Sequence, residues 1–135
     1  MRRAFIFAGI LALLPVAAFA KVTLAQDQGP AGKKFMAHFR VSQGCNSAAT
    51  TMLTITIPKS VANVDPQFVD GFIVSELHSP AQGDAASWRG TLAAKSAGDF
   101  PVAMVLPKTA GPVSFTATQF CAKGQEKSAV VLTVK

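Results

Sequence analysis

The stretch Lys34–Val41 alternates between two faces, and this alternation constrains the fold more than any other feature of the chain: one face carries Phe35, Ala37, Phe39 and Val41, and the other carries Met36, His38 and Arg40. A period of two with one apolar face is typical of a half-buried β-strand. Met52–Ile57 repeats the pattern and ends at Pro58. Nothing after residue 20 carries a sustained helical stripe. The sequence therefore predicts an all-β domain.

Six further segments have the composition of short strands, and each is bounded by Gly, Pro, Asp or Ser. They are Val22–Leu24, Gly71–Leu77, Ser87–Ala93, Phe100–Leu106, Val113–Cys121 and Ala129–Val134. Ser60–Asp70 shows no strand pattern and could hold a single helical turn. Short strands separated by turn signals indicate a sandwich or a barrel, here in one domain. The apolar faces predict a core of Phe35, Phe39, Leu53, Ile55, Ile57, Phe72, Val74, Val102, Met104, Leu106, Phe115, Phe120, Val131 and Leu132.

The first twenty residues have the three parts of a secretory signal. Arg2 and Arg3 are basic, Ala4–Ala18 is apolar, and Ala18 with Ala20 forms a small-residue cleavage site. The apolar part is shorter than the roughly 20 residues that a membrane-spanning helix needs. We expect cleavage after Ala20, which leaves a domain of residues 21–135 without a membrane span.

Charge and cysteine content narrow the function further. The chain has 13 Lys and Arg against 7 Asp and Glu, but its basic residues are scattered, whereas nucleic-acid binders cluster them. Nucleic acid is therefore not an expected partner. Two cysteines in an exported chain, Cys45 and Cys121, predict a single disulfide. Free thiols or metal ligation are the alternative.

The chain lacks the patterns of a catalytic site. Its only histidines are His38 and His78, no G-x-S-x-G occurs, and the acidic residues are scattered without a distinguishable pair. We therefore expect no enzyme and no catalytic residue. Trp88, the single tryptophan, is interpreted as a packing residue rather than a binding surface, and its indole N–H would then need a buried acceptor.

Three segments resemble the YcnI-like copper-binding proteins of bacteria. They are AKVTLAQDQGPAGKKFMAHFRVSQGCNSAATTMLTITIPKSV, WRGTL and FPVAMVLPKTAGPVSFTATQFCAKG. The resemblance implies an immunoglobulin-like β-sandwich in the periplasm, associated with copper resistance and uptake proteins. It also implies a Cys45–Cys121 disulfide, as in related proteins. In this family the metal site combines the histidine at the new N-terminus, a glutamate and a late tryptophan.

The positions equivalent to those ligands are Lys21, Gln28 and Ser128, none of which matches the family. A lysine ammonium offers no lone pair and repels a metal cation. We therefore predict no metal or cofactor, and an accessory or interaction module with an unidentified periplasmic protein partner of a copper transport or resistance system. A plain structural or adhesion sandwich is another possibility. The remaining alternative is a copper carrier with substitute ligands, drawn from Asp27, Met36, His38 and His78.

Overall fold

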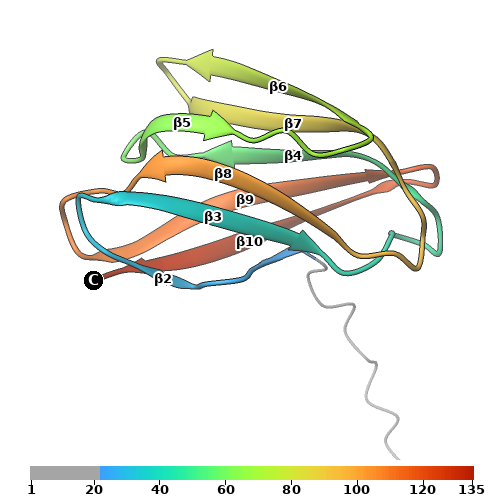
Figure 1. Cartoon of the computed structure of the whole chain (residues 1–135), viewed down its shortest axis with the longest axis horizontal. Helices are drawn as coiled ribbons and strands as arrows, with labels where there is room; N and C mark the ends of the chain where they lie inside the picture. The colour runs from blue at the N-terminus through green and yellow to red at the C-terminus, as the bar shows by residue number, and fades with distance from the viewer. Residues whose placement is uncertain (1–21) are drawn as a thin grey trace, which may run out of the picture.

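The computed structural model describes residues 22–135, which form two β-sheets packed face to face (Figure 1). The predicted signal segment, its cleavage site and Lys21 lie outside the described residues. The strands are β1 (Val22–Leu24), β2 (Gln28–Gly29), β3 (Lys34–Val41), β4 (Thr50–Ile57), β5 (Ala62–Pro66), β6 (Phe72–Ser79), β7 (Gly83–Leu92), β8 (Gly98–Val105), β9 (Gly111–Cys121) and β10 (Gln125–Val134).

The architecture is a sandwich and not a barrel. A four-stranded sheet has the order β1-β3-β8-β5, and a six-stranded sheet has the order β2-β10-β9-β4-β7-β6. Neighbouring strands are antiparallel throughout, except that β2 pairs with β10 in parallel. No helix among residues 22–135 is long and apolar enough to cross a membrane.

All eight expected strands are present, with ends shifted by a few residues, and two strands were not expected. β5 lies inside Ser60–Asp70, so the helical turn considered there was wrong. Its pairing with β8 is irregular between Ala62 and Asp65, and Val64 is its only buried side chain, so no alternation marks it. β2 has two residues, which is too short for any period.

The core lies between the sheets and contains most of the predicted residues, with Phe39, Phe100, Phe115 and Trp88 as its largest fully buried side chains. Phe39 packs edge-on against Phe115 across the sandwich, with ring centroids 5.3 Å apart. Three residues predicted for the core are only partly buried and pack against its margin. They are Phe35, Phe72 and Val74.

Two core predictions were wrong. Val131 is 49% exposed, because Leu132 faces the core and successive residues of a strand point to opposite faces. Phe120 is half-buried on the outer face for the same reason, since Gln119 and Cys121 on either side of it point inward.

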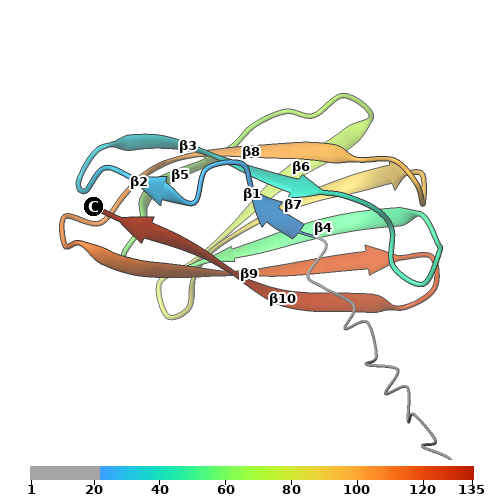
Figure 2. The same ribbon diagram turned by 90° about the horizontal axis from the view of Figure 1, so that it is seen from below.

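The two sides of the sandwich are built differently. On one side, β1 pairs with β3 in the four-stranded sheet. The chain then crosses to the six-stranded sheet, where β2 pairs with the end of β10. β1 also contacts β10, so the N-terminal segment closes this side of the sandwich (Figure 2). On the other side, β5 and β6 are the last strands of their sheets, and residues 67–71 join them. This second side carries the candidate functional site.

Candidate functional site

The predicted disulfide is confirmed: Cys45 is bonded to Cys121, with Cα atoms 5.8 Å apart. The bridge ties the β3–β4 connection to the end of β9. Next to it, the buried Gln119 side chain donates through Nε2 to the Gln43 carbonyl at 2.7 Å and to Thr50 Oγ1 at 2.8 Å. Bridge and amide together fix residues 42–49 to the sheet. Both sulfurs are in the bridge, so the thiol and metal alternatives for them are excluded.

The described residues at the family's ligand positions do not converge. Gln28 is exposed on β2 and lies opposite Thr133, whereas Ser128 is half-buried five positions earlier on β10, opposite Ala117. At about 3.3 Å per residue, their places along β10 are roughly 16 Å apart. Lys21 precedes the described chain. Neither Gln28 nor Ser128 has a side chain that copper prefers.

The substitute candidates fall into two separate groups. His38 lies on the outer face of the four-stranded sheet, where its Nδ1 is 2.9 Å from Asp99 Oδ2. His78 lies on β6 in the other sheet, and its Nδ1 is paired with Asp84 Oδ1 of β7. Within residues 22–135, no three His, Cys, Asp or Glu side chains gather as a metal site would require. Neither aspartate partner was predicted: Asp99 is 61 residues from His38, and Asp84, only six residues from His78, becomes its partner through the pairing of β6 with β7.

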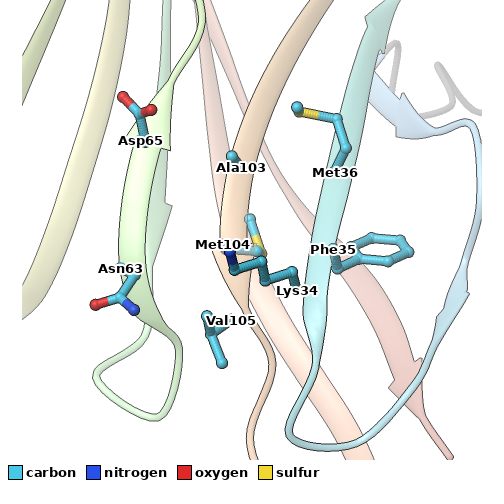
Figure 3. A pocket seen from close by; sticks show the side chains of 8 residues that line it. All are labelled: Lys34, Phe35, Met36, Asn63, Asp65, Ala103, Met104 and Val105. Carbon is cyan, nitrogen blue, oxygen red and sulfur yellow. The ribbon is translucent and has the colours of Figure 1, made fainter.

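Two shallow clefts meet at Met36, whose side chain is 41% exposed. The first, of about 580 Å³, runs over the outer face of the four-stranded sheet; Figure 3 shows Lys34 and Met36 of β3 on one wall and Asp65 of β5 on the other. The second lies between β3 and the β1–β2 segment and is lined by Met36 and Asp27. Met36 and Asp27 therefore line the same cleft, and His38 lies on the same face of β3 as Met36. His78 lies on β6 in the other sheet and does not belong with these three candidate copper ligands.

The side of the sandwich that ends in β5 and β6 exposes three large apolar side chains: Phe68 is 73% exposed, Ile73 74% and Leu77 69%. Strand β6 and the preceding Phe68 are called the β6 edge below. Among the strands of residues 22–135, β6 pairs with β7 alone, and it forms the upper border of the molecule in Figure 1. This edge was not predicted from the sequence, although Gly71–Leu77 is apolar at both odd and even positions.

The β6 edge is held in place by the core. Trp88 on β7 is fully buried between Leu53 of β4 and Val74 of β6, as the packing interpretation predicted. Its Nε1 donates to the carbonyl of Gln67 at 2.9 Å, which supplies the acceptor that the indole N–H was expected to need. This bond fixes the start of the loop that carries Phe68.

A tight connection holds the far end of β6. Gly83, with φ of +91°, begins β7 there, and an added Cβ would meet the carbonyl oxygen of Ile57. Only glycine fits such a position without strain.

These features define a class of protein, the immunoglobulin-like β-sandwiches with one disulfide. A Nocardia farcinica protein described as uncharacterized and as having an immunoglobulin-like fold is similar, with 23% identity and a TM-score of 0.66 over 80% of this chain and 81% of that one. A type I cohesin from a Clostridium thermocellum cohesin–dockerin complex has 9% identity and a TM-score of 0.58 over 85% and 98%. A cohesin module from a Clostridium perfringens family 33 glycoside hydrolase has 14% identity and a TM-score of 0.57 over 85% and 96%.

At such identities the similarity concerns the fold alone. The chain belongs to the family described as domain of unknown function DUF1775, whose model matches residues 21–129. No protein with curated function matches it.

Proposed function

We propose that the chain is an exported, non-enzymatic accessory module of a copper-handling system, which acts by contact with a protein partner at the β6 edge. The observation that carries the proposal is the exposure of Phe68, Ile73 and Leu77 along one border of the sandwich. Grouped apolar side chains of this size are typical of protein interaction sites. The copper link rests on the resemblance to YcnI-like proteins.

Export has two supports. The first twenty residues carry the signal pattern, and the Cys45–Cys121 bridge is of a kind that persists in oxidising compartments such as the bacterial periplasm. We therefore place the mature chain in the periplasm, after cleavage following Ala20.

Copper binding is expected to be weak in the mature protein. Residues 21–135, titrated with Cu(II) against a weak competing chelator, should show no binding tighter than micromolar, because lysine replaces the imidazole of the family's N-terminal ligand. Lys21→His should tighten the binding, and blocking its α-amine should reverse the gain. Tight binding by the unchanged chain would contradict the proposal that copper is not its cargo.

A copper carrier with substitute ligands is the second candidate, and one arrangement favours it. Asp99 is hydrogen-bonded to Nδ1 of His38, which leaves Nε2 of the imidazole to bind an ion. Carboxylates orient metal-bound histidines in proteins in the same way. Met36 is on the same face and shares a cleft with Asp27. Imidazole and thioether both suit copper. If the unchanged chain binds copper tightly and Met36→Leu or His38→Asn abolishes the binding, this candidate replaces the first.

The role of the β6 edge can be tested in the bacterium that encodes the chain. The double change Ile73→Lys and Leu77→Lys should lower copper tolerance as far as deletion of the gene does, because two charges on the contact surface oppose desolvation. Val131→Lys is the matched control, since Val131 is also an exposed apolar residue on the outer face of the same sheet. Normal tolerance in the double variant would contradict the role of the edge. Normal tolerance in the deletion strain would contradict the copper link.

A further inference from the structure

We infer that the partner of the β6 edge is a second copy of this chain, whose β6 pairs antiparallel with the first and places Ser75 opposite Ser75 of the second copy. The inference rests on the proposed function, because it names the partner of the same surface.

The backbone of β6 is suited to such pairing. The strand runs over Phe72–Ser79 and is hydrogen-bonded to β7 along one side, while no strand of the described residues is bonded to its other side. Natural edge strands are commonly kept short or carry proline or lysine, which prevents further pairing. β6 contains neither residue, and it is much longer than β1 and β2, the edge strands on the opposite side.

Charge and apolar matching select one register. Two antiparallel registers pair almost the whole of β6 with its copy and keep the outer faces of the two six-stranded sheets on the same side of the joined sheet. In one of them Ser75 lies opposite Ser75, and in the other Glu76 lies opposite Glu76. The second places Glu76 directly opposite Glu76 of the other copy, and like charges in opposed positions are destabilising. It also places Ile73 opposite Ser79 and Leu77 opposite Ser75 of the other copy. The register centred on Ser75 avoids both defects.

In the register centred on Ser75, the strand is complementary to itself. Ile73 lies opposite Leu77 of the second copy, and Leu77 lies opposite its Ile73, since both residues are two positions from the centre. Directly opposed side chains on an antiparallel pair have Cβ atoms about 4.5–5.5 Å apart, close enough for contact. Each of the two apolar side chains, now 74% and 69% exposed, thus gains an apolar partner.

The inner face agrees with this arrangement. Val74 lies opposite Glu76 of the second copy, and Phe72 lies opposite its His78, so no two like charges are directly opposed. On β7, the neighbours of Ile73 and Leu77 are Arg89 and Ala85. Alanine is too small to cover Leu77, whereas a second copy would cover it.

The experiment uses the mature chain, residues 21–135, and single cysteines as reporters of register. Ser75→Cys should form a disulfide-linked dimer on mild oxidation. Leu77→Cys alone should link poorly, but an equimolar mixture with Ile73→Cys should link well. Val131→Cys, on the same outer face but on β10, four strands away from β6, is the control for random collision. A dimer that forms without preferential linking at Ser75 would overturn the register.

Sedimentation velocity on the unchanged chain tests the pairing itself. A concentration-dependent dimer is expected, and Ile73→Lys should weaken association by about tenfold or more, because it places a charge in the apolar contact. Circular dichroism confirms that the variant is folded. A strictly monomeric chain at the highest attainable concentration would overturn the inference.

The two proposals fail separately. If the chain is monomeric but the double lysine variant still lowers copper tolerance, self-pairing is wrong and the β6 edge serves a different protein. If the dimer forms with the expected register but the double variant keeps normal tolerance, pairing is right and the proposed function of the edge is wrong.

Discussion

Replacing Cys45 by serine is expected to lower the free energy of unfolding by about 4 kcal/mol, because the bridge closes a long loop in the unfolded chain. Cys45 and Cys121 are 76 residues apart, and the bridge joins the β3–β4 connection to β9. In the variant, the hydrogen bond from Gln119 to the Gln43 carbonyl holds this connection without the bridge beside it. Denaturant unfolding of the oxidised protein, followed by tryptophan fluorescence, measures the change.

The control is the unchanged chain after reduction of its disulfide. It should unfold at the same denaturant concentration as the double variant Cys45→Ser/Cys121→Ser, because both proteins lack the bridge. Equal stability of oxidised and reduced protein would contradict a structural bridge. Two free thiols, found by mass spectrometry in protein exported to the periplasm, would contradict the bridge altogether.

Trp88→Ala is expected to destabilise the domain by about 3–5 kcal/mol, the usual cost of removing a large buried aromatic side chain. Trp88 is fully buried, and its ring centroid lies 5.4 Å from that of Phe100 on the opposite sheet. The change also removes the donor to the Gln67 carbonyl. Chemical unfolding gives the stability, and hydrogen exchange over residues 67–71 should show less protection.

Trp88→Phe separates the two contributions. It keeps an aromatic ring in the core but leaves the Gln67 carbonyl without its donor, which should cost about 1–3 kcal/mol. Val131→Ala, at an exposed position, should change stability by no more than about 0.5 kcal/mol. If Trp88→Ala behaved like Val131→Ala, the packing role of Trp88 would be wrong.

The fold was largely predictable wherever one face of a strand is buried and the other is exposed. β3 alternates over its whole length and β4 alternates from Leu53 to Ile57, so these strands and their inward residues follow from the sequence. β5 was missed because one buried valine makes no pattern. Val131 was misplaced because Val130, Val131 and Leu132 are all apolar, and composition alone does not indicate which of them faces the core.

The candidate site was much less predictable, because it depends on which strands are neighbours. The bridge could be predicted, since the chain has only two cysteines. The pairing of His38 with Asp99 joins β3 to β8 and is visible only once those strands are known to lie side by side. The exposure of Ile73 and Leu77 likewise follows from the position of β6 at the end of its sheet, because the same residues on an inner strand would gain neighbours on both sides.

The division of the N-terminal segment between the two sheets limits how copies of this chain can assemble. On that side β1 has three residues and β2 has two, so β1 covers only Phe39–Val41 of β3, and β2 covers only Thr133 and Val134 of β10. Among the described strands, β6 in contrast pairs with β7 alone and has a second side that no strand covers at any point of its length. A pair joined through β6 uses this edge of both copies, so the β6 contact closes at two copies instead of continuing into a fibre.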